Sequence, residues 1–267
     1  MVRVETFANI AEAAGAMNQE TRFLAGGTLV MEAVNYGSQR FNRIVRTRDP
    51  AMKSISLDSS RIVIGAGVTM ADILRNPELS FLAPAARAVG GPAIRNMATV
   101  GGNLFAPNPY GDFATALLAL DADVRFTDGS ETPIESFFSN RHSSRGLVAA
   151  VIVNRRPDIE LRFKKVSRVK PKGIAVMSIA VALNRQVGRL SNTRIAFGAM
   201  GPTALRAKAA EAALESATLD AAGVASALNR TMEGLAPQDD PIASAWYRAS
   251  VAPVHLRRLL LGEESFR

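Results

Sequence analysis

The chain has 267 residues, of which 48% are hydrophobic and 21% charged, and this ordinary globular mixture excludes a disordered, collagenous or coiled-coil chain. Its formal net charge of +8 would suit an acidic partner, although an arginine-rich soluble surface would explain the same excess. The absence of cysteine excludes disulfides, thiolate zinc sites and iron–sulfur clusters ligated by cysteines of this chain.

The first half of the chain predicts short strands and helices separated by glycine turns. Residues 7–17 are expected to form a helix, and the apolar run 22–25 reads as a strand that enters the tight turn Gly26-Gly27. Thr28 is expected to cap the helix that follows this turn. Further strands are predicted at 44–46, 61–64, 121–126 and 147–153, and further helices at 69–75 with Thr69 as its cap, 80–89, 113–120 and 134–138.

The second half changes from a β-rich region to one rich in alanine and leucine. Strands are predicted at 161–166, 175–183 and 194–200, with Val187-Gly188 in a turn, and this is the pattern of a three-stranded antiparallel sheet. Helices are expected at 203–216, 220–233 and 243–261.

The predicted fold class is α+β, with a two-part N-terminal domain of mixed α/β character followed by a C-terminal antiparallel three-stranded sheet with a helical bundle. The polar stretch 154–159 gives the boundary between them. We therefore expect domains at 1–157 and 158–267, the first divided into subdomains at about 1–52 and 53–157.

Two turns place paired glycines beside a threonine, at 24–28 (LAGGT) and at 99–104 (TVGGNL). Glycine lets the backbone approach a ligand closely, and successive N–H groups then form a concavity that suits a phosphate. Neither turn has the Gly-Lys-Ser/Thr of a Walker loop or the Rossmann glycine pattern. Gly-Gly pairs also occur in ordinary turns, so each turn alone indicates little, whereas two in one domain could hold both phosphates of a dinucleotide.

The second turn lies in a longer and more specific context. Residues 93–104 read AIRNMATVGGNL, 109–112 read PYGD, and 113–121 read FATALLALD. This run resembles the FAD-binding subunit of the molybdenum hydroxylases, the family of xanthine dehydrogenase, carbon monoxide dehydrogenase and aldehyde oxidoreductase. The resemblance extends from the AGGT of the first turn to the WYR segment at 246–248. It implies that the N-terminal domain binds FAD.

The resemblance also implies which residues contact this cofactor. The first turn would face the FAD diphosphate with its backbone N–H groups, the second turn would contact the same cofactor, and later residues would line its adenosine end and its flavin ring. These residues are Leu24, Ala25, Gly26, Gly27, Thr28, Leu29 and Val30 in the first segment, Thr99, Gly102 and Asn103 in the second, Phe105 and Ala106 beyond it, Gly111 and Asp112 at the adenosine end, and Leu147 and Lys164 near the flavin ring.

The residues by themselves leave other roles open. Asp112 could be the N-cap of the next helix, Leu147 a core residue of its strand, and Lys164 an exposed solubilising side chain. The chain departs from the family at Leu29, where many members have a polar residue, so only a backbone contact is expected there. It departs again at Val169, where the family often has a second arginine.

In the family that the chain resembles, the work is divided among subunits. A large subunit carries the molybdenum cofactor, a small subunit carries two [2Fe-2S] clusters, and the FAD subunit passes electrons to an acceptor such as NAD, a quinone or oxygen. The resemblance therefore implies the FAD subunit of a multi-subunit oxidoreductase, assembled as a heterotrimer or its dimer. The basic surface would then dock to more acidic partner subunits.

Two other interpretations stay open. The chain could be a stand-alone FAD- or nucleotide-binding protein with an assembly or sensor role, or a nucleic-acid-binding protein. The second is suggested only by the basic charge, and the 6% of aromatic residues, with no stripe that interleaves them with basic residues, argues against it. We therefore expect no nucleic-acid partner.

Location and metal content follow from what the sequence lacks. The longest apolar runs, 81–86 and 147–153, are far shorter than the roughly 20 residues of a membrane span. The first ten residues contain no apolar signal segment, so we expect a cytoplasmic protein without a membrane span. Only two histidines, His142 and His255, are present, and they lie far apart, so no metal site is expected in this chain.

Overall fold

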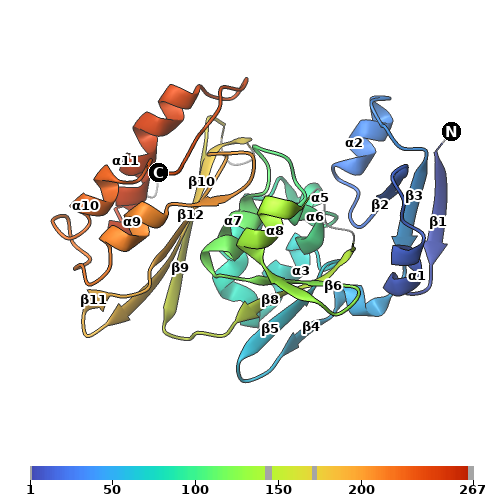
Figure 1. Cartoon of the computed structure of the whole chain (residues 1–267), viewed down its shortest axis with the longest axis horizontal. Coiled ribbons are helices and arrows are strands. Elements are labelled where there is room, and N and C mark those ends of the chain that lie inside the picture. The colour runs from blue at the N-terminus through green and yellow to red at the C-terminus, as the bar shows by residue number, and fades with distance from the viewer. Residues whose placement is uncertain (1, 142–145, 170–172, 264–267) are drawn as a thin grey trace.

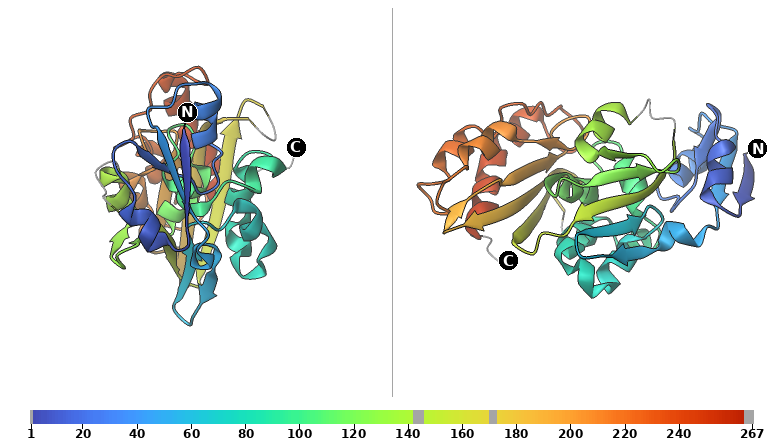
Figure 2. Two further views of the ribbon diagram at one scale, coloured as in Figure 1. Left: turned by 90° about the vertical axis from the view of Figure 1, so that its right-hand side faces the viewer. Right: turned by 60° about the horizontal axis from the view of Figure 1, so that its bottom comes forward.

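The structure, a computed structural model, describes residues 2–141, 146–169 and 173–263. Three units follow one another along the longest axis, from the N-terminal unit at one end to the C-terminal unit at the other (Figure 1). The right-hand view in Figure 2 shows the same order, with the middle unit between its two neighbours. His142 lies outside the described residues.

The N-terminal unit is a parallel three-stranded sheet in the order β1-β3-β2. Ile44 and Val45 of its central strand are buried. β2 leads directly into the first glycine turn, so the sheet fixes where that turn begins. The elements are β1 (Arg3–Phe7), α1 (Ile10–Gly15), β2 (Thr21–Phe23), α2 (Val30–Asn35) and β3 (Arg43–Thr47).

The middle unit is a five-stranded antiparallel sheet in the order β4-β5-β8-β6-β7, covered by short helices. Every residue of α7 is buried, which explains the apolar FATALLA run of the sequence. The elements are η1 (Pro50–Lys53), β4 (Ile55–Leu57), β5 (Arg61–Gly65), α3 (Met70–Arg75), η2 (Pro77–Leu82), α4 (Ala83–Ala88), α5 (Pro92–Arg95), α6 (Val100–Leu104), α7 (Asp112–Ala119), β6 (Asp123–Phe126), β7 (Glu131–Pro133), α8 (Ile134–Asn140) and β8 (Val148–Asn154).

The C-terminal unit is an antiparallel sheet in which β10 pairs with β9, β11 and β12. The three strands predicted from the sequence are confirmed as β9, β10 and β12, and the short strands β11 and β13 extend the sheet. The elements are β9 (Ile159–Ser167), β10 (Ala175–Gln186), β11 (Arg189–Leu190), β12 (Arg194–Gly198), β13 (Leu205–Arg206), α9 (Lys208–Ala213), α10 (Ala225–Asn229) and α11 (Ala245–Leu261).

The C-terminal sheet separates two hydrophobic cores. Successive side chains of a strand point to opposite faces, so Ala180 and Ala182 of β10 pack in the core of the middle unit, whereas Ile179 and Val181 pack in the core beneath α9–α11. Both faces of β10 are therefore buried, which accounts for its continuous apolar run. The middle and C-terminal units consequently share one sheet surface and pack as a continuous body.

Several predicted element ends were wrong, and each error has a local cause. The predicted helix 7–17 begins only at Ile10, where the Asn9 side chain accepts a hydrogen bond from the backbone of Glu12. α2 begins at Val30 after Leu29, without a side-chain cap, so Thr28 does not cap it. The cap at Thr69 is confirmed, with Asp72 completing a capping box.

The predicted helices 203–216 and 220–233 are shorter in the structure. Residues 205 and 206 instead form β13, which pairs with β12 through Phe197↔Leu205 and Ala196↔Arg206. The pairing with β12 is a tertiary contact, and helix propensity describes only the local sequence. No helix within the described residues is long and apolar enough to cross a membrane.

Candidate functional site

A groove of about 1330 Å³ lies where the N-terminal and middle units meet and reaches the edge of the C-terminal sheet. This exceeds the about 300–1,000 Å³ typical of pockets for drug-sized ligands, so an extended dinucleotide can be accommodated. Residues of both glycine turns line it, together with residues of the 146–148 segment and Lys165 of β9. Two turns some seventy residues apart in sequence thus open into one cavity.

The first glycine turn packs directly against the segment that carries the second. A Cβ atom at Gly26 would lie 1.7 Å from the backbone oxygen of Met97, so only glycine permits this close approach. Gly27 has a φ of +75°, in the left-handed region that favours glycine. The two glycines therefore have different duties, since Gly26 allows the contact between the turns and Gly27 allows the bend.

The backbone donors of the first turn are available to a ligand. Within the described residues, the N–H groups of Ala25, Gly26, Gly27, Thr28 and Leu29 donate to no protein acceptor. Unpaired N–H groups that face a cavity suit an anion, because they supply partial positive charge without a counter-ion. The first turn is therefore the place where this groove can bind a phosphate through the backbone.

The second turn is arranged differently, because its backbone donors are already used. The N–H groups of Val100 and Gly101 donate to the carbonyls of Val68 and Ala66, and that of Gly102 donates to Thr99 Oγ1 at 3.1 Å. Thr99 is in this way the N-cap of α6. The second turn can therefore contact a ligand through side chains, such as the Thr99 hydroxyl, more readily than through its N–H groups.

The cap at Thr99 leads to a prediction for stability and binding. Thr99→Ala should lower the free energy of unfolding by about 1 kcal/mol, because the N–H of Gly102 loses its acceptor, and it should weaken FAD binding as the turn loosens. Urea denaturation and a fluorescence titration with FAD measure the two effects. Thr99→Ser keeps the hydroxyl and should restore both, and equal loss in the Ser and Ala variants would contradict the capping role.

The side chain of Asn103 connects the second turn to α7. Its Oδ1 accepts a hydrogen bond of 2.8 Å from the backbone N–H of Ala114, in the first turn of that helix. Asp112 is the first residue of α7, with Gly111 as the N-cap in a left-handed conformation. The sequence alternative in which Asp112 caps the helix is therefore wrong.

Asp112 instead forms a buried ion pair at the wall of the groove. Lys165 Nζ lies 2.7 Å from Asp112 Oδ2, and the two side chains are 14% and 7% exposed. Asp112 Oδ1 is buried without a hydrogen-bond partner. Burial raises the pKa of the Asp112 carboxyl, and Lys165 and Ser178 oppose this rise. The carboxylate is therefore held by one cation and keeps one free acceptor.

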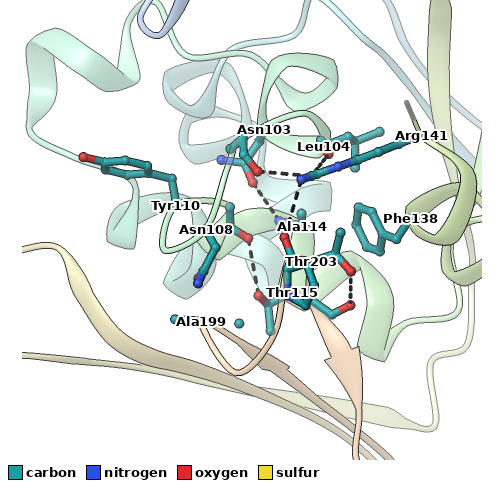
Figure 3. Close-up of a pocket in the computed structure, with 15 residues that line it drawn as sticks. Asn103, Leu104, Asn108, Tyr110, Ala114, Thr115, Phe138, Arg141, Ala199 and Thr203 are labelled. Atoms are coloured by element: carbon teal, nitrogen blue, oxygen red, sulfur yellow. Dashed lines mark hydrogen bonds between the residues drawn. The ribbon is translucent and has the colours of Figure 1, made fainter. Parts of the chain in front are cut away.

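A smaller pocket adjoins the groove and shares Asn103, Tyr110 and Arg141 with it (Figure 3). The Arg141 guanidinium donates to the carbonyls of Leu104 and Ala106, each at 3.2 Å. A weaker bond of 3.5 Å reaches the carbonyl of Pro202, which follows β12. Arg141 therefore links the segment after the second turn to the C-terminal unit.

The groove contains most of the site residues predicted from the sequence. Leu24 and Lys164 are not among the described residues that line it. Leu147 and Phe105 contribute apolar wall, and the ring of Phe105 packs edge-on against Phe137 at 5.4 Å between centroids. Those that line it are Ala25, Gly26, Gly27, Thr28, Leu29, Val30, Thr99, Gly102, Asn103, Phe105, Ala106, Gly111, Asp112 and Leu147.

The placement of the two lysines follows from strand alternation. Lys165 pairs across the sheet with Ser178, on the face toward α7, whereas Lys164 pairs with Ile179, on the face toward α9–α11. Lys165 was not predicted as a site residue, although the apolar Phe163 two residues earlier lies on the same face of the strand. Tyr110 and Arg141 were also missed, and no local pattern distinguishes them from surface residues.

Three independent features of the groove suit a flavin dinucleotide. Five backbone donors of the first turn are free for a diphosphate. A Cβ at Gly102 would meet nothing within 4 Å except Thr99 Oγ1, so the missing side chain leaves open space for a ligand. Asp112 Oδ1 is an acceptor without a donor, as a sugar hydroxyl would require.

The chain matches two known protein families, one in each half. Residues 1–154 match the family described as the FAD binding domain in molybdopterin dehydrogenase, and residues 162–262 match the CO dehydrogenase flavoprotein C-terminal domain. The chain is 26% identical to the xanthine dehydrogenase FAD-binding subunit of Escherichia coli O157:H7, over 92% of this chain and 89% of that protein. It is 28% identical to subunit alpha of the 6-hydroxypseudooxynicotine dehydrogenase complex of Paenarthrobacter nicotinovorans, over 90% and 86%.

Solved structures agree with these relatives. A chain of carbon monoxide dehydrogenase from Hydrogenophaga pseudoflava superposes with a TM-score of 0.89 at 25% identity, covering 97% of this chain and 96% of that chain. The first family match includes both glycine turns, the second includes most of the C-terminal sheet, and the superposition covers nearly the whole chain. The chain therefore belongs to the family of FAD-binding subunits of the molybdenum-containing dehydrogenases, which are parts of multi-subunit oxidoreductases.

Proposed function

We propose that this chain is the electron-transfer subunit of a molybdenum hydroxylase complex. It would receive electrons from [2Fe-2S] clusters in a small partner subunit and pass them to an external acceptor such as NAD, a quinone or oxygen. A large partner subunit would carry the molybdenum cofactor and oxidise the organic substrate. Membership of the FAD-subunit family supports this division of work, as does the absence of cysteine from the chain. The cytoplasmic location expected from the sequence belongs to the same proposal.

The observation that carries the proposal is the convergence of the two glycine turns on one groove with unpaired donors. We assign the FAD diphosphate to the N–H groups of the first turn and the adenosine end to Gly111 and Asp112. Leu147 and Phe105 would form the apolar wall against the flavin ring. A place for Lys164 beside that ring rests on the family resemblance alone.

When bound, FAD supplies the redox chemistry, since it can exchange electrons one at a time with a cluster and one or two at a time with an acceptor. The protein residues contribute binding and orientation. The first turn would hold an anion through its backbone N–H groups, and the ion pair with Lys165 favours the charged form of the neighbouring carboxylate. The apolar wall excludes water from one side of the groove, which strengthens the electrostatic interactions within it.

Gly102→Val tests the assignment of the groove to FAD. The new Cβ would lie 2.9 Å from Thr99 Oγ1 and meet nothing else within 4 Å, so the variant should fold once that hydroxyl shifts, and its side chain would fill the space that the ligand needs. We expect FAD affinity to fall by about a hundredfold, the equivalent of roughly 3 kcal/mol of lost contacts. A fluorescence titration of the apo-chain measures it, with circular dichroism to confirm folding. Stoichiometric FAD in the folded variant would contradict the assignment.

The electron route needs the assembled complex. Co-purification of the chain with its partner subunits, followed by metal and flavin analysis, should give one FAD, molybdenum and two [2Fe-2S] clusters per unit. Addition of the organic substrate should then bleach the flavin absorbance. A chain that carries FAD but joins no iron-containing partner would instead support a stand-alone FAD-binding protein.

A further inference from the structure

The groove contains a buried pair of opposite charges, Lys165 and Asp112, which the proposed phosphate and flavin contacts do not use. Lys165 Nζ donates to Asp112 Oδ2 at 2.7 Å and to the carbonyl oxygen of Ala88 at 3.0 Å. Both charged residues line the groove. The pair is therefore part of the groove wall, and its members are largely buried.

Each member of the pair keeps unused hydrogen-bonding capacity. The lysine ammonium has three donors, of which the described residues take two. Asp112 Oδ1 has no partner, and a buried acceptor that stays unpaired costs about 1–3 kcal/mol. A donor and an acceptor side by side match hydroxyl groups, which can both accept and donate. A phosphate oxygen would be repelled by Oδ1, so this chemistry favours a sugar over an anion.

The fold fixes the pair from two sides. Lys165 lies opposite Ser178 in the β9–β10 register, and Ser178 Oγ lies 3.1 Å from the hydroxyl of Thr115 in α7, the helix that begins with Asp112. Removal of the lysine would leave the carboxylate buried without a cation, a state that proteins avoid by protonating the acid. A protonated Asp112 would lose acceptor capacity where the ligand needs it.

We propose that Lys165 is a positioning residue for the sugar of the adenosine half of FAD: it holds Asp112 charged, with Oδ1 free to accept a hydrogen bond from a ribose hydroxyl. The inference rests on the proposed function, since it concerns the same groove. It concerns the adenosine half alone, and FMN lacks that half. Lys165 should therefore affect the binding of FAD but not that of FMN.

The test is a double-mutant cycle on the full chain, freed of flavin, with FAD and FMN titrated separately by fluorescence. Lys165→Met should weaken FAD binding by about tenfold or more and leave FMN binding unchanged. Because Lys165 acts through Asp112, Lys165→Met in an Asp112→Asn background should add less than about twofold. Lys165→Arg, which keeps the charge, should bind FAD within about threefold of the wild type.

Lys208→Met is the matched control, since it removes the lysine of a more exposed ion pair, in which Lys208 Nζ lies 2.6 Å from Glu135 Oε1 away from the groove, and it should leave the ratio of FAD to FMN affinity unchanged. Equal losses for FAD and FMN in Lys165→Met, or additive losses in the cycle, would overturn the inference. If Lys165→Met does not fold, Lys165→Gln takes its place in the cycle under the same criteria. A wild-type chain that binds no FAD would overturn the proposed function itself, which is a separate result.

Discussion

Gly26→Ala should abolish tight FAD binding, although it adds a single methyl group. The new Cβ would lie 1.7 Å from the backbone oxygen of Met97, and a backbone atom cannot move aside as a flexible side chain can. The first turn must therefore shift away from the second, and the N–H groups of 25–29 would no longer face the same ligand. Loss of two charge-assisted hydrogen bonds, worth about 1.5–3 kcal/mol each, predicts a loss of affinity of about a hundredfold or more.

Isothermal titration of the apo-chain with FAD measures this effect. Gly15→Ala is the matched control, because a Cβ at Gly15 meets nothing within 4 Å and the residue, at the end of α1, does not line the groove. The control should bind FAD as the wild type does and be equally stable or slightly more so. Wild-type affinity in Gly26→Ala would show that the contact between the turns does not matter for binding.

Arg248→Ala should lower the free energy of unfolding by about 3–5 kcal/mol. This arginine is fully buried within α11, and its guanidinium donates to Asp240 Oδ2 at 2.7 Å and to the carbonyls of Val176, Gln238 and Ala243. Truncation would leave a carboxylate without its cation and would remove one hydrogen-bond donor from each of three carbonyls. Such a loss is a large fraction of the about 5–15 kcal/mol that stabilises a typical domain.

Urea denaturation, followed by circular dichroism, gives the loss directly. Arg257→Ala supplies the comparison within the same helix, since Arg257 pairs with Glu263 at 2.6 Å while about 40% of each side chain is exposed. An exposed pair of this kind contributes about 1 kcal/mol at most. If both variants lost a similarly small amount of unfolding free energy, the burial of Arg248 would not add to its contribution to stability.

The sequence alone determined the character of the elements that local patterns specify. Alternating apolar residues and turn signals gave β9, β10 and β12, and the Thr69–Asp72 spacing gave the capping box that begins α3. The paired glycines marked the two turns, because a backbone that must bend or approach closely requires glycine wherever the chain later places it. Helix propensity gave a wrong prediction at 203–208, because two of these residues pair with β12 and form β13.

Only the tertiary structure decided which of these features meet and how they divide the work. In the fold, the two turns meet where Gly26 packs against Met97. The first turn has free backbone N–H donors, whereas those of the second turn already donate to Val68, Ala66 and Thr99. The fold also places Lys165 rather than Lys164 beside Asp112. Hydrogen-bond partners and strand faces depend on contacts between segments distant in sequence, so no local pattern specifies them.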